Sequence, residues 1–436
     1  MIVERASYNW AYAEDIPGSR CGPEDGPWPR SYQVLNEDEL WRELRILAKP
    51  QSMSLPSTTK ERWKADALNF QPSPSTKTQD RYVVTQLDIH GRLWTFTGVF
   101  DGHLGDVTVE HVAHHLPIIV REFLQKALEN GAAYTPQSIS DLFVHAIEAF
   151  DDAIAHDVLD LFGGSVDQLD NYTDAQIRET INDQHKGGAN WRKTRLCMYG
   201  TTALVALVDP DHHNLWLANL GDCQAFFVSQ DPTAQDWKVE TLTTSHNGDN
   251  DAEVERVRKA HPGEPECVIE RRVLGALAPT RCLGDIPFKQ PPSFTRRILY
   301  NLFPGFHNTS PWEEFLVRNR TPPYITASPE VVHRRLDRNT SDTSQRYLIL
   351  ASDGFTDLCS GEGQKRVVES WARGMAAHDP SEGITDAEPG SRSDNMALRL
   401  LRRALGGEDR FGVSRVLTLD MDVAWIDDTS IVVQLL

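Results

Sequence analysis

The stretch LWTFTGVFDGHLGD, residues 93–106, is an apolar run that stops on an aspartate, a glycine and a histidine. Phe96 and Phe100 predict a buried strand, so Asp101 and His103 follow at its end. An Asp-Gly pair after a strand is typical of a turn. A metal site at this point would need further carboxylates that other strands deliver in the same way.

Other apolar strands carry aspartates at their edges. YLILASDG reaches Asp353, NLWLANLGD reaches Asp222, and Asp427 and Asp428 precede the final run TSIVVQLL. One such aspartate indicates a turn, but their recurrence along one chain predicts carboxylates that converge. Carboxylate oxygens without His or Cys suit Mg²⁺ or Mn²⁺ rather than zinc.

Strand runs alternate with helical stretches from residue 81 onward. RYVVTQLDIHGRLWTFTGVF predicts two strands around a turn, and helical stretches follow at about 106–129 and 136–161. A meander of strands comes next in YGTTALVALVDP, NLWLANLGDCQAFFVS and WKVETLT, and the last third mixes strands with helices. This order predicts an α+β fold of two sheets covered by helices.

The composition also divides the chain into two parts. Residues 1–79 are rich in Pro and Ser and predict a partly disordered extension, with one amphipathic helix in NEDELWRELRILAK. Residues 80–436 are expected to form the folded domain. Within it, Gly-rich, polar or Pro-rich stretches predict insertions near 163–195, 286–323 and 377–393.

Charge and cysteine content exclude several classes of function. The formal net charge of −19 leaves no electrostatic footprint for nucleic acid or anionic membranes. The six cysteines include no C-x-x-C pair, which argues against a disulfide scaffold or structural zinc. No apolar run approaches the ~18 residues that cross a bilayer, and the N-terminus resembles neither a secretory nor a transit signal. We expect a soluble, intracellular monomer without membrane insertion, cytoplasmic by its N-terminal composition.

Several motifs occur in the order of a known family. VFDGH, GTTALVALV followed by ANLGDCQA, TRCLGD, ASDGFTD and DDTSIVV together resemble the metal-dependent type 2C serine/threonine protein phosphatases. SHNGDNDAEVERVRKAHPGE, PPYITASPEV and DNMALRLLRRALGG are similar to the pyruvate dehydrogenase phosphatase branch of that family. Residues 80–436 would then be the phosphatase domain.

The resemblance implies a four-layer fold and a metal centre. A central antiparallel β-sandwich would be flanked on both sides by helix pairs, with two Mg²⁺ or Mn²⁺ ions at one end. Asp101 would bridge both ions and Gly102 would offer its carbonyl oxygen. Asp353 and Asp427 would complete the shell of the first ion, and Asp222 matches the position of a third, weaker ion in some members.

Two further residues take their expected roles from the same resemblance. Asp80, in TQDRY, matches an acidic residue that holds metal-bound water, and His103 would be the general acid in direct attack by a metal-activated water. The chain departs from the common pattern at Gln79, where many members have Glu, and at Ser75, where many have a phosphate-binding Arg. The neutral Gln79 gives the second ion less negative charge, so we expect that ion to bind weakly.

These residues support a leading hypothesis and a rival. The leading hypothesis is metal-dependent hydrolysis of phosphoserine or phosphothreonine in a phosphoprotein, with His103 and Asp101 as the catalytic residues. The rival is a catalytically weak or dead member that serves as a phosphoprotein-binding or regulatory scaffold. Loss of Asp101 would favour the rival, and Asp101 is present. The branch resemblance implies pyruvate dehydrogenase as substrate and the mitochondrial matrix as the alternative to the cytoplasm.

Overall fold

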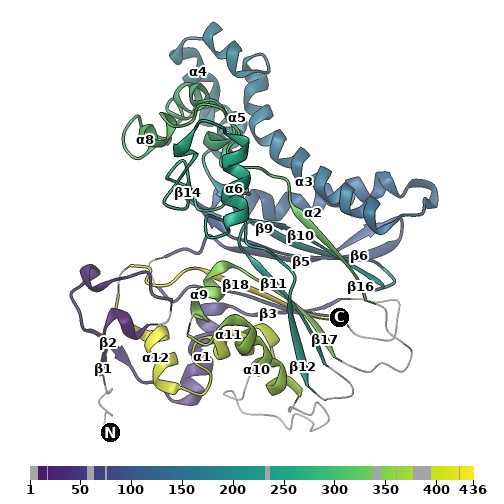
Figure 1. Cartoon of the computed structure of the whole chain (residues 1–436), viewed down its shortest axis with the longest axis vertical. Coiled ribbons are helices and arrows are strands. Elements are labelled where there is room, and N and C mark those ends of the chain that lie inside the picture. The colour runs from purple at the N-terminus through teal and green to yellow at the C-terminus, as the bar shows by residue number, and fades with distance from the viewer. Residues whose placement is uncertain are drawn as a thin grey trace.

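The computed structural model is built around two large antiparallel sheets packed face to face, with helices on both outer faces (Figure 1). It describes residues 8–16, 18–55, 63–73, 76–230, 236–336, 345–359, 361–376, 394–421 and 423–436. Side chains of both sheets fill the space between them, among them Val99, Leu204, Leu217, Leu350 and Val432. The predicted α+β sandwich with helical layers on either side is confirmed.

The first sheet has the strand order β16-β10-β9-β6-β5. Its strands are β5 (Arg81–Ile89), β6 (Arg92–Phe100), β9 (Ala203–Val208), β10 (Asn214–Leu220) and β16 (Glu330–Arg335). β5 and β6 form the predicted hairpin, since His90 and Gly91 both have positive φ, 53° and 79°, as tight two-residue turns require. β6 is buried from Trp94 to Phe100, which explains its continuous apolar run.

The second sheet has the strand order β12-β11-β17-β18-β4-β3. Its strands are β3 (Gln51–Leu55), β4 (Trp63–Phe70), β11 (Gln224–Gln230), β12 (Trp237–Thr241), β17 (Arg346–Ala351) and β18 (Thr429–Leu435). β4 lies between β18 and β3, with Leu68 opposite Ile431. Two strands of this sheet therefore precede residue 80, where the sequence places the start of the folded domain.

The physical reason for this difference is the composition of β4. The small Ala65 and Ala67 pack between the sheets, whereas Leu68 and Phe70 pack toward the helices. Asp66 is fully buried and accepts a hydrogen bond from the backbone N–H of Met396 at 2.6 Å. Small residues around a buried carboxylate give a weak strand signal in the sequence. The predicted boundary after residue 79 therefore does not coincide with the start of the second sheet, which includes β3 and β4.

Helices cover the first sheet on one side. α2 (Val107–Ala127) and α3 (Pro136–Leu159) agree with the helical stretches expected at 106–129 and 136–161. α3 begins as the sequence indicates, with the Thr135 hydroxyl accepting from the Ser138 backbone N–H and Pro136 in the first turn. Both helices pack on the sheet through Val112, Phe143 and neighbouring apolar side chains.

The second sheet is covered on its outer face by a separate set of helices (Figure 1). They are α1 (Glu37–Ala48), α9 (Asp353–Leu358), α10 (Gln364–Ala376), α11 (Met396–Ala404) and α12 (Arg410–Thr418). α1 is the amphipathic helix that the sequence predicts, and it buries Leu40, Trp41 and Leu44 against this layer. The described part of the N-terminal region is thus packed on the sandwich.

The first two predicted insertions pack against each other at the end of α3. They contain α4 (Asp174–Ile181), α5 (Ala189–Leu196), α7 (Pro292–Phe294), a π-helical turn (Thr295–Leu299) and α8 (Trp312–Leu316). One buried cluster joins Ile177 and Ile181 with Phe294 and Ile298. α6 (Asp251–Ala260) and the strand pair β13 (Val268–Ile269) and β14 (Arg272–Val273) lie beside these two packed insertions (Figure 1). The third predicted insertion, 377–393, lies outside the described residues.

Short strands complete the structure. β7 (Gly102–His103), β8 (Gly200–Thr201) and β15 (Leu283–Gly284) form a small sheet in the order β15-β8-β7. β1 (Tyr8–Ala11) pairs with β2 (Arg30–Gln33) in the N-terminal region. In the part of the chain that the structure describes, no helix combines the length and the apolarity needed to span a bilayer.

Candidate metal centre

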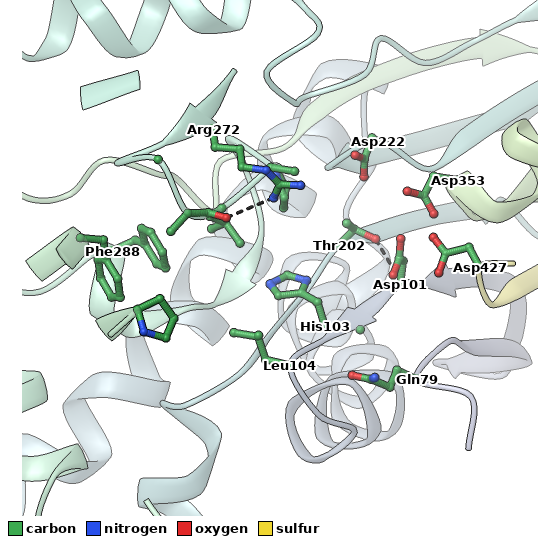
Figure 2. A pocket seen from close by; sticks show the side chains of 18 of the residues that line it. Gln79, Asp101, His103, Leu104, Thr202, Asp222, Arg272, Phe288, Asp353 and Asp427 are labelled. Carbon is green, nitrogen blue, oxygen red and sulfur yellow. Dashed lines mark hydrogen bonds between the residues drawn. The ribbon is translucent and has the colours of Figure 1, made fainter. Parts of the chain in front are cut away.

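Strand ends from both sheets meet at a pocket of about 670 Å³ (Figure 2). It is lined by Asp101 after β6, Asp222 near the end of β10, Asp353 near the end of β17 and Asp427 just before β18. β6 and β10 belong to one sheet and β17 and β18 to the other, so the carboxylates approach from both layers. The structure thus brings the predicted strand-end aspartates together.

Three of these aspartates form a tight cluster. Asp101, Asp222 and Asp353 each offer a carboxylate oxygen, and these atoms all lie within 4.8 Å of one another. The carboxylate of Asp427 points toward the same cluster in Figure 2 and forms an ion pair with Arg20. Asp222 is additionally held by the Asn247 side-chain amide, which donates to its Oδ2 at 3.0 Å.

Backbone hydrogen bonds fix Asp101 at the end of β6. Its N–H donates to the Thr202 hydroxyl at 3.1 Å (Figure 2), and its carbonyl accepts from the Thr202 N–H at 2.9 Å. The Thr201 hydroxyl donates to the same carbonyl at 3.0 Å. Gly102 must be a glycine, because an added Cβ would lie 2.7 Å from both the Gln79 carbonyl oxygen and Val109 Cγ1. The backbone at Gly102 therefore packs closely against Gln79 and Val109 where it lines the pocket.

Burial and mutual repulsion raise the pKa values of these carboxylates. Burial is the largest cause at Asp101, where Asp353, Asp80 and Asp222 add further negative charge and raise the pKa well above its ordinary value. Burial and the charge of Asp353 raise the pKa of Asp222 to about 6. Burial, followed by the charges of Asp428 and Asp353, raises the pKa of Asp80 to about 8. Clustered carboxylates with raised pKa values favour a bound cation, which would relieve the repulsion.

Unpaired acceptors surround the cluster and fit such a cation. Asp353 Oδ1, Asp80 Oδ2 and Gln79 Oε1 are buried and have no hydrogen-bond partner among the described residues. Asp80 is only 1% exposed and is not among the residues that line the pocket. Gln79 does line the pocket, and its backbone N–H donates to Asp428 Oδ2 at 2.6 Å. The donor set consists of oxygen atoms alone, which suits Mg²⁺ or Mn²⁺.

His103 faces the pocket from β7 and is held by a buried carboxylate. Its Nε2 lies 2.6 Å from Asp285 Oδ2, and the Cys282 thiol donates to the same oxygen at 3.0 Å. Burial alone would lower the pKa of His103, but Asp285, together with Asp222 and Asp353, raises it above its ordinary value. The imidazole is therefore held in a fixed orientation and favoured in its protonated form.

Sequence reasoning assigned no role to three residues that contact the predicted site. Asp285 and Thr202 belong to TRCLGD and GTTALVALV, two motifs that carry the family resemblance, so a signal for them was present. Arg20 comes from the predicted N-terminal extension, where its backbone N–H donates to the Trp425 carbonyl at 2.6 Å. No local pattern in the sequence indicates that this arginine reaches Asp427.

The relatives of this chain are phosphatases by name. The mitochondrial acetyl-transferring pyruvate dehydrogenase phosphatase 1 of Homo sapiens is 27% identical over 412 residues, covering 81% of this chain and 74% of the human protein. A protein phosphatase 2C homolog of Schizosaccharomyces pombe is 27% identical, and the match covers 81% of this chain and 76% of the yeast protein. The pyruvate dehydrogenase phosphatase 1 of Saccharomyces cerevisiae is 29% identical, covering 63% and 44% respectively.

A family model described as protein phosphatase 2C matches residues 85–383, more than half of the chain. The match includes the strand ends that carry Asp101, Asp222 and Asp353. The chain therefore belongs to the protein phosphatase 2C family and is a protein serine/threonine phosphatase.

Proposed function

We propose that this phosphatase depends on Mg²⁺ or Mn²⁺ held by the carboxylate pocket. The observation that carries the proposal is the cluster of Asp101, Asp222 and Asp353, with oxygen atoms within 4.8 Å of one another. Two ions would be held by Asp101, Asp353, Asp427 and the Gly102 carbonyl, all of which line the pocket. Asp222 would contribute to a third, weaker ion, and Asp80 would hold metal-bound water.

The residues of the pocket then divide the chemistry between them. When bound, the ions would acidify a water molecule and neutralise the oxygens of the phosphoryl group. His103 would protonate the departing seryl or threonyl oxygen, since an alkoxide leaves poorly without a proton. Its Nε2 is engaged by Asp285 at 2.6 Å, so Nδ1 is the ring nitrogen that would deliver the proton. Asp285 would act by orienting His103 and stabilising its charge.

Asparagine variants of the carboxylates test the proposal. Asp101→Asn and Asp353→Asn keep the side-chain shape but remove negative charge, so turnover of a phosphothreonine peptide should fall by orders of magnitude. Chelation of the wild type should abolish turnover, and Mg²⁺ or Mn²⁺ should restore it. Asp38→Asn, an exposed position at the start of α1, is the matched control and should behave as wild type.

The same experiment decides against the proposal if Asp101→Asn retains the wild-type rate. A wild-type protein that binds phosphopeptides but never hydrolyses them, with or without metal, would instead be a phosphoprotein-binding or regulatory scaffold. The chain keeps all the predicted aspartates: Asp101, Asp222, Asp353 and Asp427 line the pocket, and Asp80 is buried. This completeness favours the enzyme.

For the substrate, we propose a phosphoserine of pyruvate dehydrogenase, because relatives in humans and budding yeast carry that enzyme in their names. Phosphorylated pyruvate dehydrogenase should be dephosphorylated faster than phosphorylated casein under identical conditions, and equal rates would reject this choice. The names of these relatives also include the word mitochondrial. They favour the matrix over the cytoplasm, which imaging of the full chain with a C-terminal tag would test.

A further inference from the structure

The pocket extends beyond the carboxylates into a compartment with apolar walls. On that side it is lined by Leu104, Leu277, Phe288, Trp312 and Phe315. Figure 2 shows Phe288 and Leu104 on one side of His103 and the aspartates on the other. The whole pocket measures about 670 Å³, within the range of sites that hold ligands much larger than a phosphoseryl side chain. The apolar compartment is therefore space that the phosphoresidue alone leaves unfilled.

Leu104 is an unusual residue at the entrance to this compartment. It follows His103 directly, its φ is 64°, and its side chain is 57% exposed. A left-handed backbone is unfavourable for leucine, and such strain is found where the surrounding structure enforces it for a purpose. An exposed leucine in a concave surface also loses the stabilisation that burial would give. The exposure is explained if a ligand covers Leu104.

The aromatic wall of the compartment, formed by Phe288, Trp312 and Phe315, is held by rings packed against one another. Phe288 stacks on Phe315 with ring centroids 4.7 Å apart and an interplanar angle of 6°. Trp312 stacks on Phe306 with centroids 3.6 Å apart. These residues belong to the second predicted insertion, so the insertion supplies one side of a preformed apolar site. Preformed sites bind without the cost of ordering their own side chains.

Two arginines that line the pocket also donate hydrogen bonds to the backbone. Arg272 Nη1 donates to the Ala276 carbonyl at 3.1 Å (Figure 2), and Arg318 Nη1 donates to the Leu274 carbonyl at 2.9 Å. Both bonds hold the turn that carries Leu277 against the pocket. Glu314, which also lines the pocket, adds a negative charge on this side. Both guanidinium groups keep their positive charge, so the fit to an apolar group rests on the apolar side chains that line this part of the pocket.

We propose that this compartment receives an apolar side chain of the phosphoprotein, located within about three residues of the phosphoserine or phosphothreonine. The inference rests on the proposed function of the carboxylate pocket. The supporting observation is that the carboxylates and the apolar side chains line one continuous pocket. An extended peptide advances about 3.3 Å per residue, so a neighbouring side chain reaches the apolar compartment while the phosphate lies at the carboxylates. The substrate class is thus a phosphoprotein with a large aliphatic or aromatic residue beside the phosphorylated one.

Matched phosphopeptides test this preference. A set of phosphoserine nonapeptides would carry Leu, Asn or Asp at each of the three positions on either side of an otherwise fixed sequence. We expect kcat/KM for the Leu peptide to exceed that of the Asn peptide by about 10-fold at the best position, as apolar pockets commonly discriminate. Equal values at all positions, or a preference for Asp, would overturn the proposal.

Two variants assign the preference to the compartment. Leu104→Asn places a polar residue that tolerates positive φ in the compartment, and Trp312→Ala removes part of the aromatic wall. Both should reduce the Leu-to-Asn ratio toward one, and Leu104→Asn keeps the test valid if Trp312→Ala fails to fold. Val317→Asn is the matched control: Val317 is 66% exposed, follows α8 and does not line the pocket, so its ratio should stay at the wild-type value.

Failure of the inference differs from failure of the proposed function. A wild type that hydrolyses p-nitrophenyl phosphate and every peptide without preference would reject the apolar compartment only. A wild type that hydrolyses neither p-nitrophenyl phosphate nor any peptide with metal present would reject the phosphatase chemistry itself. Turnover of p-nitrophenyl phosphate also normalises each variant for the state of its catalytic centre.

Discussion

Gln79 sets a neutral amide among carboxylates. Its side-chain Oε1 is buried and has no hydrogen-bond partner in the described part of the chain, and its backbone N–H is fixed by the hydrogen bond to Asp428 at 2.6 Å. The backbone position of this residue therefore does not depend on its side-chain charge. A carboxylate at the same place would add one negative charge to the wall of the pocket.

We expect Gln79→Glu to lower the half-saturating Mg²⁺ concentration for phosphatase activity several-fold, because added negative charge strengthens cation binding. Titration of activity with Mg²⁺ measures the effect. Gln137→Glu, at an exposed position in the first turn of α3, should leave the titration unchanged. A shift upward, or none, would place Gln79 outside the surroundings of the ions.

Single residues also show where sequence reasoning succeeds and where it stops. Asp101, Asp222 and Asp353 were predictable because each ends a recognisable apolar strand, and such ends meet at the edge of a sheet. Asp285 contacts His103 from 182 positions along the chain, and Arg20 reaches Asp427 from the N-terminal region. Such contacts depend on the packed structure and leave no local periodicity in the sequence.

At the scale of elements, the sheet β15-β8-β7 assembles the pair of His103 and Asp285. Gly200 on β8 lies opposite His103 in the strand register. An added Cβ at Gly200 would lie 2.6 Å from His103 Nε2 and would clash with the Asp285 carboxylate, so only glycine leaves room for the pair. Three strands of two residues each thus determine how the imidazole faces the pocket.

His103→Ala should slow hydrolysis of a phosphoserine peptide by ~10²-fold or more, because the leaving alkoxide then lacks a proton donor. The loss with p-nitrophenyl phosphate should be much smaller, since nitrophenolate leaves without protonation. Asp285→Asn should show the same contrast in weaker form, because the imidazole remains but loses its carboxylate partner. Equal losses on both substrates would remove His103 from the general-acid role.

β4 supports a second prediction at this scale. A chain that starts at residue 80 lacks β3 and β4 and exposes the edge of β18, including Ile431 and Val433, which are fully buried in the intact sheet. We expect this truncated chain to aggregate or to unfold at a much lower temperature than a chain that starts at residue 8. Thermal unfolding of both proteins measures the difference, and equal stability would restore the boundary at residue 79.

At the scale of the whole molecule, the carboxylates make folding sensitive to pH and metal. The pKa of Asp80 is about 8 in the fold, against about 3.9 for an unfolded chain. The fold therefore binds more protons than the unfolded chain between these values, and stability of the metal-free protein should fall as pH rises through this window. Cations displace the same protons, so apparent Mg²⁺ affinity should rise with pH.

Thermal unfolding at pH 6 and pH 8, each with a chelator and with saturating Mg²⁺, measures both effects. The metal-free protein should unfold at a lower temperature at pH 8 than at pH 6, and Mg²⁺ should stabilise it more at pH 8. Asp80→Asn should raise the stability of the metal-free protein at pH 8 and weaken its pH dependence. Metal-free stability that increases between pH 6 and pH 8 would contradict the assignment.

The layers of the fold could be predicted from the sequence, but some of the packing contacts between distant segments could not. The alternation of strands with α2 and α3 was visible because long amphipathic periods are strong signals. The packing of the first two insertions against each other was not, since Ile177 and Ile298 are brought together only by the tertiary structure. β4 is not predictable for a local reason, because its small residues carry little apolar signal of their own.

The position of β18 has a consequence for how the protein is made. This strand is the last that the ribosome synthesises among those described, yet it lies between β17 and the early strand β4. The strands β17 and β4 cannot be linked in one sheet until β18, which pairs with both, has left the exit tunnel of the ribosome. The predicted metal ligand Asp427 emerges together with β18. Contacts between such distant segments also slow folding. A nascent chain would thus remain inactive until β18 has emerged, which keeps an unfinished phosphatase from acting.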